Sequence, residues 1–123
     1  MQAGTVVRHR WSDIAPEQIN PSITRQYISG DRVTIARFEL KAGGVVPRHA
    51  HENEQVSMVL SGALLFRIDG RETTIRGGEV MQIPGNVAHE VEVLEDTLVV
   101  DVFSPVRQDW IDKTDSYFNR PPR

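Results

Sequence analysis

The chain has 123 residues, 39% of them hydrophobic and 25% charged, which is enough for one hydrophobic core and too little for two full domains. A formal net charge of -3 at pH 7 gives no general attraction to phosphate backbones or anionic lipids, so we expect no nucleic acid and no membrane among its partners. The sequence has no cysteine, which excludes disulfides and thiolate metal sites and fits a reducing compartment.

Residues 1–22 show no clear periodicity, and we expect them to form an N-terminal arm. Within this arm, residues 5–10 are a candidate edge strand, and residues 11–14 are a candidate loop or single helical turn. Residues 1–10 lack the apolar stretch of a signal peptide, and no apolar run reaches the length of a membrane span. These features predict a soluble, cytoplasmic protein.

Residues 23–106 show short strand patterns separated by glycine-containing turns, which is typical of an all-β sandwich or barrel. The predicted strands are 23–29, 32–40, 56–60, 63–68, 71–75, 80–83 and 97–103. The predicted turns between them are at Gly30-Asp31, Ser61-Gly62, Asp69-Gly70, 76–79 and 84–86. After this single domain, residues 107–123 are predicted to form a short helix or a tail.

Side-chain alternation in the last part of the domain indicates which residues face the interior. Successive side chains of a strand point to opposite faces, so His89 shares a face with Val91 and Val93. If these valines fill the core, His89 is inside as well. Asp101 and Phe103 share a strand face in the same way. A carboxylate within so apolar a strand is costly unless it is paired or functional.

Two predicted strands, 56–60 and 97–103, are apolar on both faces. In a small sheet protein only one strand face can point into the core, so the outer face of these strands needs another cover. A second copy of the chain is the simplest cover. We therefore expect a homodimer.

Three of the four histidines are candidate ligands of one metal ion. His49 and His51 point to the same side of an extended segment, close enough to share an ion, and His89 is expected inside. Gln55 can return to that side after a turn, whereas Glu54 has the opposite parity and is the alternative fourth ligand. Imidazole ligands suit Mn, Fe, Co, Ni, Cu or Zn, while Mg and Ca prefer oxygen. The sequence predicts one divalent transition metal.

The spacing around these residues resembles the two motifs of the cupin superfamily. The two blocks read Gly43-x5-His49-x-His51-x3-Gln55-x6-Gly62 and Gly78-x5-Pro84-x4-His89. Gln55 stands where the family usually has Glu, and Asn86 and Val93 replace its usual Gly and Asn. The resemblance implies a jelly-roll β-barrel of two antiparallel sheets that holds a metal inside its mouth. The implied metal ligands are His49, His51, Gln55 and His89.

The run Asp-Val-Phe-Ser-Pro-x-Arg at residues 101–107, together with Gln55 in the first motif, looks like the pectin-degradation cupins of the KdgF type. Those enzymes convert unsaturated uronate monomers, released by pectate and alginate lyases, to linear keto-uronates. The resemblance implies that Asp101, Phe103 and Arg107 matter for activity. We expect Asp101 to move the proton, Arg107 to pair with the substrate carboxylate, and Phe103 to pack against the sugar.

The neutral amide of Gln55 would leave a bound ion with more net positive charge than a carboxylate would, which favours an anionic substrate. The predicted function is therefore a metal-dependent uronate isomerase or tautomerase. The first alternative is another cupin enzyme, such as a metal-dependent dioxygenase, which would consume oxygen. The second alternative is a cupin that binds a small molecule or a sugar without catalysis.

Overall fold

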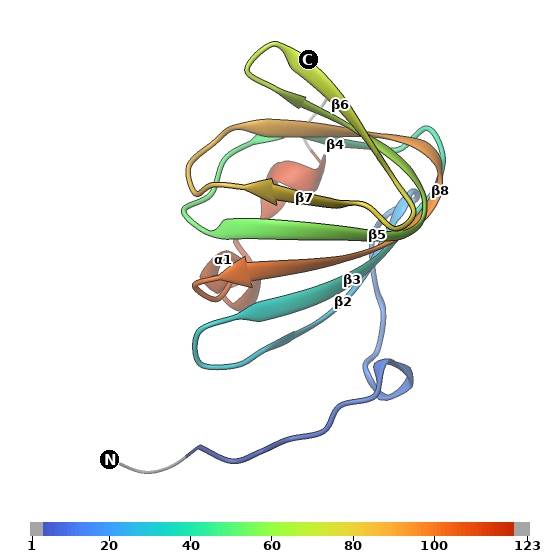
Figure 1. The fold of residues 1–123 in the computed structure, drawn as a ribbon. Helices are drawn as coiled ribbons and strands as arrows, with labels where there is room; N and C mark the ends of the chain where they lie inside the picture. Colours follow the sequence, from blue (N-terminus) through green and yellow to red (C-terminus); the bar gives the residue numbers. More distant parts are fainter. Residues whose placement is uncertain (1–3, 120–123) are drawn as a thin grey trace.

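A computed structural model describes residues 4–119 as one antiparallel sheet of eight strands that curls into an open barrel (Figure 1). In chain order the elements are η1 (Trp11–Asp13), β1 (Glu17–Asn20), β2 (Ile23–Ser29), β3 (Thr34–Leu40), β4 (Val45–His49), β5 (Glu54–Ile68), β6 (Arg71–Arg76), β7 (Val80–Ile83), β8 (His89–Ser104), α1 (Gln108–Ile111) and η2 (Ser116–Asn119). The prediction of an all-β barrel of antiparallel strands is confirmed.

Two long strands, β5 and β8, give the barrel its two layers. The first half of β5 pairs with β7 and with the second half of β8, which continues to β3, β2 and β1. The second half of β5 pairs with β6 and with the first half of β8, which also pairs with β4. Both strands therefore cross from one layer to the other and join the layers into a single domain.

The prediction of a turn at Ser61-Gly62 was wrong, because β5 runs through these residues without reversing. The register with β8 shifts on both sides of Ser61, so the two strands bend together. Gly62 has a φ of 98°, and a Cβ there would collide with the Asp96 carbonyl and the Thr97 side chain. Glycine is needed here for a bend between layers rather than for a turn.

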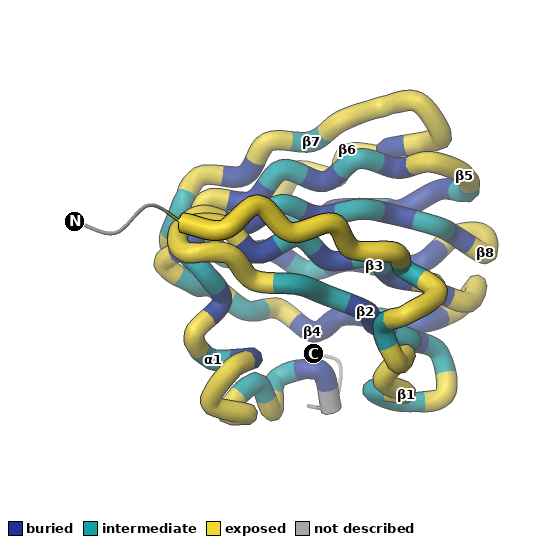
Figure 2. The backbone as a smooth tube through the Cα atoms, turned by 90° about the horizontal axis from the view of Figure 1, so that it is seen from below, coloured by how far each residue is buried: buried dark blue, intermediate teal, exposed yellow. Residues whose placement is uncertain are grey.

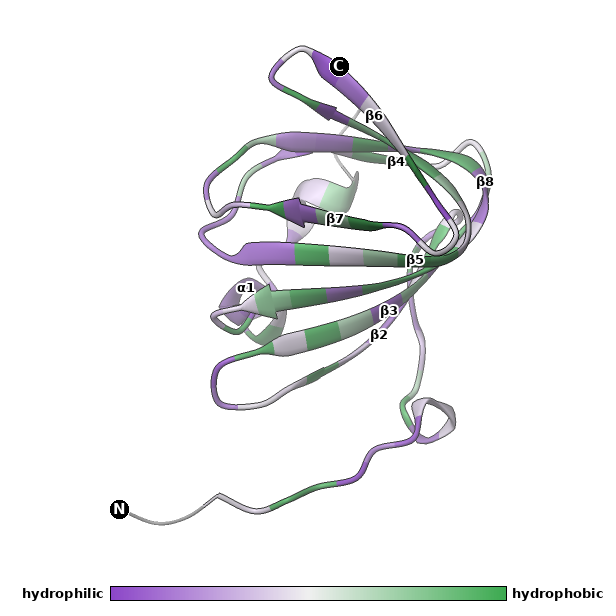
Figure 3. Ribbon diagram, viewed as in Figure 1, coloured by the Kyte–Doolittle hydropathy of each residue, from purple (hydrophilic) through white to green (hydrophobic). Residues whose placement is uncertain are grey.

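The core lies between the two layers and is filled by the inward-facing residues of both. Burial alternates along β8, and His89, Val91 and Val93 are all buried, as parity predicted. Figure 3 shows hydrophobic and hydrophilic bands along the strands, with hydrophobic bands on the two long strands β5 and β8. Asp101 and Phe103 also face the interior.

The segments outside the barrel differ in how they pack. Residues 4–10 are exposed and contain no strand, so the edge strand predicted for residues 5–10 was wrong (Figure 2). The helical turn predicted at residues 11–14 is present as η1. After β8, α1 and η2 fold back against the barrel and bury Trp110 and Phe118. Residues 120–123 of the predicted tail lie outside the described residues. No helix in residues 4–119 is long and apolar enough to cross a membrane.

Candidate metal centre and active site

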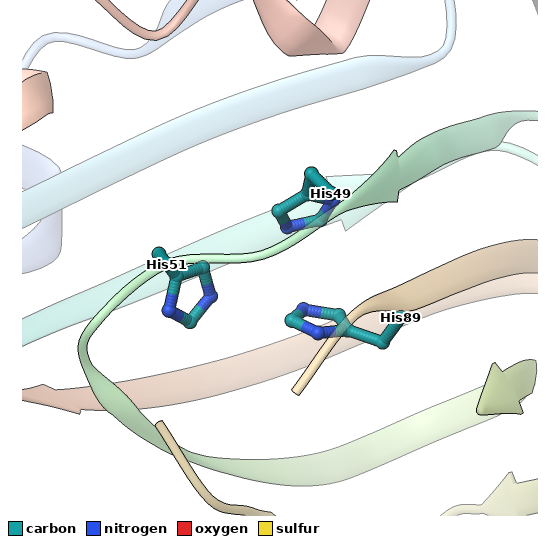
Figure 4. Close-up of side chains that lie close together, drawn as sticks. All are labelled: His49, His51 and His89. Carbon is teal, nitrogen blue, oxygen red and sulfur yellow. The ribbon is translucent and has the colours of Figure 1, made fainter. Parts of the chain in front are cut away.

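Three histidines from two segments of the chain lie close together, with their rings turned toward one another (Figure 4). His49 is the last residue of β4, and His89 is the first residue of β8 directly opposite it in the sheet. His51 lies in the loop after β4 rather than in a strand. The three rings each offer a nitrogen, and these nitrogens lie within 4.8 Å of one another. This spacing fits three ligands of a single ion.

The three rings are oriented by their own local backbone. In each ring Nδ1 lies 2.8–3.0 Å from the main-chain carbonyl two positions away: Pro47 for His49, Asn53 for His51 and Val87 for His89. A neutral ring that donates from Nδ1 presents the Nε2 lone pair, which is the arrangement that a metal-binding histidine needs.

The electrostatic environment keeps the three rings neutral. Burial, followed by the neighbouring His89, lowers the pKa of His49 to about 3. Burial and the positive charge of Arg107 lower the pKa of His51 to about 4, and burial also lowers the pKa of His89. Neutral imidazole is the form that binds metal, so the rings are ready to bind an ion at neutral pH.

Gln55 completes the histidine cluster from the start of β5. Its side chain is buried, whereas Glu54 is exposed on the opposite strand face. Gln55 Oε1 lies 3.1 Å from His51 Nε2, and Gln55 Nε2 donates to Ser57 Oγ at 3.0 Å. The oxygen of Gln55 and the Nε2 lone pair of His51 are both electron-rich, so a shared cation suits the pair better than a direct contact. The residues present therefore fit one divalent transition metal.

A cavity extends from this cluster into the barrel. Its polar lining consists of His49, His89, Gln55, Ser57, Asp101, Arg107 and Tyr117. The rest of the lining is apolar and aromatic, from Phe38, Phe66, Phe103, Trp110 and Phe118 among others. His51 lies beside it, with its ring 5.7 Å from that of Phe103. A mostly apolar cavity with a few convergent polar groups is the usual form of a small-molecule site.

Asp101 is the unusual group in this cavity. Its side chain is buried opposite Ser57, and Oδ1 has no hydrogen-bond partner within the described residues. Burial raises the pKa of Asp101 to about 7, although the Ser57 hydroxyl and the charge of Arg107 act in the other direction. A carboxyl that titrates near neutral pH can both accept and return a proton.

Arg107 folds back into the cavity, as the proline before it suggested. It is 1% exposed and lies over the rings of Phe103 and Trp110, at 4.6 and 4.4 Å from their centroids. Its Nε and Nη2 donate to the two carboxylate oxygens of Asp109 at 2.9 and 2.8 Å. The guanidinium is therefore fixed in orientation and brings a positive charge to the cavity wall.

Sequence reasoning missed Trp110 and Tyr117, which line the cavity, and Asp109, which binds Arg107. Trp110 packs edge-on against Phe103 with centroids 5.1 Å apart, and the Tyr117 ring stacks on His49 at 4.2 Å. The only sequence signals were two apolar pairs in an otherwise polar stretch, Trp110-Ile111 and Tyr117-Phe118. Nothing in that pattern indicated which face of the barrel the tail would cover.

The match to known families agrees with this geometry. Residues 36–104 match the cupin domain, which is more than half of the chain. The chain belongs to the cupin family. The match includes β4, the three histidines and the part of β8 that carries Asp101.

Individual relatives are similar over most of their length. The pectin degradation protein KdgF of Dickeya dadantii is 26% identical over 98 residues, which cover 77% of this chain and 89% of that protein. An oxalate-binding protein of Thermotoga maritima is 26% identical over 105 residues, covering 75% of this chain and 87% of that protein. The structure of KdgF from Halomonas sp. superposes with a TM-score of 0.80 at 26% identity, covering 86% of this chain and 99% of that one.

Proposed function

We propose that this cupin is a metal-dependent enzyme that opens unsaturated uronate monomers to linear keto-uronates. The observation that carries the proposal is the buried Asp101 carboxyl, which lines the same cavity as His49 and His89 and has one oxygen without a partner among the described residues. The resemblance to two KdgF proteins supports the same substrate class.

The reaction is an isomerisation, so atoms balance without a co-reactant. An unsaturated uronate is a cyclic hemiacetal whose ring oxygen is bonded to a carbon of a carbon–carbon double bond. Removal of the hemiacetal hydroxyl proton forms a carbonyl and breaks the bond between the anomeric carbon and the ring oxygen. The electron pair of that bond passes to the ring oxygen and gives an enolate, and return of the proton to carbon then gives the ketone. One group that takes and returns a proton is sufficient.

The cavity offers a group for each of these needs. Asp101 takes the hydroxyl proton and returns a proton to carbon, for which its pKa of about 7 is suited. Arg107 attracts the substrate carboxylate, and the Phe103 ring next to it packs on the sugar. A divalent ion held by His49, His51, His89 and Gln55 would polarise substrate oxygens.

One observation favours a second candidate, a cupin that binds a small organic acid without transforming it. The Thermotoga maritima relative is named for oxalate binding, and Arg107 would attract any small carboxylate. A cupin dioxygenase is the third candidate and rests on the histidine cluster alone. The candidates differ in what they consume, since the isomerase needs no oxygen and the binding protein changes nothing.

Incubation of the metal-loaded protein with lyase-released uronate monomers tests the proposal. We expect the ultraviolet absorbance of the conjugated double bond to disappear, NMR to show a linear keto-uronate, and an oxygen electrode to record no uptake. Bound but unchanged uronate would favour the binding protein, and oxygen uptake would favour the dioxygenase.

We also propose that the protein is a homodimer that uses the outer face of β3, β8, β5 and β7. Neighbouring apolar side chains cover this face in register: Ile35, Val102, Val56, Val100, Met58 and Val80. Most of them are half-buried, and Val80 is 59% exposed. A second copy would remove this apolar surface from water. Light scattering should give the dimer mass, and Met58→Glu should give the monomer mass.

A further inference from the structure

The C-terminal segment brings one more polar side chain to the mouth of the cavity. Tyr117, in η2, lies flat on His49, with ring centroids 4.2 Å apart and an angle of 15° between the planes. Its hydroxyl accepts a hydrogen bond of 2.9 Å from Arg107 Nη2. Tyr117 therefore touches a histidine of the candidate metal centre with its ring and the guanidinium with its hydroxyl.

The position of Tyr117 is held by contacts between other residues of the C-terminal segment and the barrel. Arg25, which is 3% exposed, binds Asp115 at 2.8 Å, two residues before Tyr117. The Trp110 ring lies against two guanidinium groups, that of Arg25 at 4.3 Å and that of Arg107 at 4.4 Å. The segment is thus anchored on the body of the barrel, so Tyr117 is part of the cavity wall and not a frayed tail.

We propose that Tyr117 is a positioning residue for the anionic substrate: its hydroxyl sets the direction of Arg107, and its ring sets the place of that hydroxyl relative to His49. The inference rests on the proposed function, because that function supplies the substrate carboxylate that Arg107 would bind. It assigns Tyr117 no proton transfer.

The two partners of Arg107 explain why a tyrosine is required at this position. Asp109 occupies Nε and one hydrogen of Nη2, and the Tyr117 hydroxyl accepts from the same Nη2. The bidentate contact with Asp109 fixes the plane of the guanidinium, and the Tyr117 hydroxyl adds a third hydrogen bond at Nη2 from a side chain that itself lines the cavity. Phenylalanine would keep the ring on His49 but would lose this third hydrogen bond.

The variant Tyr117→Phe separates the hydroxyl from the ring. We expect KM for the unsaturated uronate to rise about ten-fold with kcat changed less than about two-fold, since a hydrogen bond to a charged group is lost and the proton-transfer group is intact. Metal content should equal that of the wild type because the ring still covers His49. Tyr117→Ala should in addition weaken metal retention against a chelator.

Tyr27→Phe is the matched control. Tyr27 also packs on Trp110, with centroids 5.2 Å apart, and its hydroxyl bonds the Trp110 carbonyl at 3.5 Å. Tyr27 does not line the cavity in the described structure. The same loss of a hydroxyl there should leave KM, kcat and metal content unchanged.

Binding of saturated galacturonate, measured by calorimetry on the metal-loaded protein, tests the inference without turnover. Tyr117→Phe should weaken galacturonate binding about ten-fold and leave binding of neutral galactose unchanged. A wild type that binds galacturonate but converts no unsaturated uronate would overturn the proposed function alone, provided Tyr117→Phe weakens that binding. An active Tyr117→Phe with wild-type KM and wild-type galacturonate affinity would overturn the role of Tyr117 alone. A wild type that neither binds nor converts these acids would overturn both.

Discussion

Two walls of the cavity differ in how their polar groups are held. What we call the histidine wall consists of His49 and His89, which line the cavity, and His51 beside it, and each ring is oriented by a backbone carbonyl two residues away. The carboxylate wall consists of Asp101 and Arg107: Asp101 has an oxygen with no partner among the described residues, and Arg107 depends on the C-terminal segment. Each histidine ring is thus oriented by a backbone group two residues away, whereas Arg107 is oriented by side chains of the C-terminal segment.

Removing one histidine ring should have the largest effect on metal binding. His89→Ala deletes a buried ring of the candidate metal centre at the start of β8. We expect metal affinity to fall by more than about 100-fold, because loss of a group that merely orients a ligand already costs about 10–100-fold. Metal analysis and uronate turnover measure the effect. His9→Ala, in the exposed N-terminal segment, is the control and should keep its metal. A His89→Ala protein with full metal content would refute the proposed metal centre.

Asp101→Asn should lower turnover without affecting metal binding by the histidine wall. The amide has the shape of the carboxyl but cannot accept the proton, so turnover should fall by about 10²–10⁴-fold. Metal content should not change, because Asp101 is not part of the histidine cluster. The absorbance assay and metal analysis on the same sample give both results. An unaffected rate would remove Asp101 from the mechanism.

The pH dependence of stability sharpens the same contrast. Burial raises the pKa of Asp101 from its ordinary value to about 7, so the folded protein holds this proton more tightly than the unfolded chain does. The stability contributed by the protonated form is complete below about pH 4 and is lost as pH rises through about 7. We expect the metal-free wild type to lose about 2–3 kcal/mol relative to Asp101→Asn between pH 5 and pH 8.

Urea unfolding of both metal-free proteins at the two pH values measures this difference. The direction of the change is the main test: the free energy of unfolding of Asp101→Asn should rise relative to that of the wild type as pH increases. Parallel stability curves would show that Asp101 is ionised in the folded protein well below neutral pH, which would argue against its role as the base.

The histidine wall could be predicted from the sequence because side-chain alternation along a strand depends only on neighbouring residues. Strand parity correctly placed His89 with Val91 and Val93 in the interior, and it put the Gln55 side chain inside and Glu54 outside. The same local reasoning failed at Ser61-Gly62. A glycine with positive φ can reverse a chain or bend it, and the outcome here depends on β8 bending alongside β5, which parity does not reveal.

The carboxylate wall could be predicted only in part, because its partners come from a segment with no strand periodicity. The sequence placed Asp101 and Phe103 on one face and suggested that the chain turns after Pro105. It could not show that Tyr117 would reach His49, since that contact depends on Arg25 binding Asp115 from the opposite end of the chain. Such tertiary contacts leave no periodic signal in one sequence.

The smallest expected effect concerns Gln55, which lies where the two walls meet. Its Oε1 is beside His51, and its amide nitrogen donates to Ser57, the residue paired with Asp101. Gln55→Glu keeps the shape, adds a negative charge and removes the hydrogen bond that the Gln55 amide donates to Ser57. We expect tighter metal binding and, because the ion then has less net positive charge, a KM for the anionic substrate raised about three- to ten-fold.

Glu54→Gln is the control for this charge effect. Glu54 is the neighbouring residue on the exposed strand face, where it accepts a hydrogen bond from Gln82 at 3.2 Å. A charge change at this position is screened by solvent, so KM and metal affinity should stay at wild-type values. Chelator competition and initial rates, measured for both variants, compare an inward with an outward charge at adjacent positions. If Gln55→Glu bound metal more tightly without any change in KM, the ion would hold its place in the histidine wall without attracting the substrate, and the substrate's charge would be recognised by Arg107 alone.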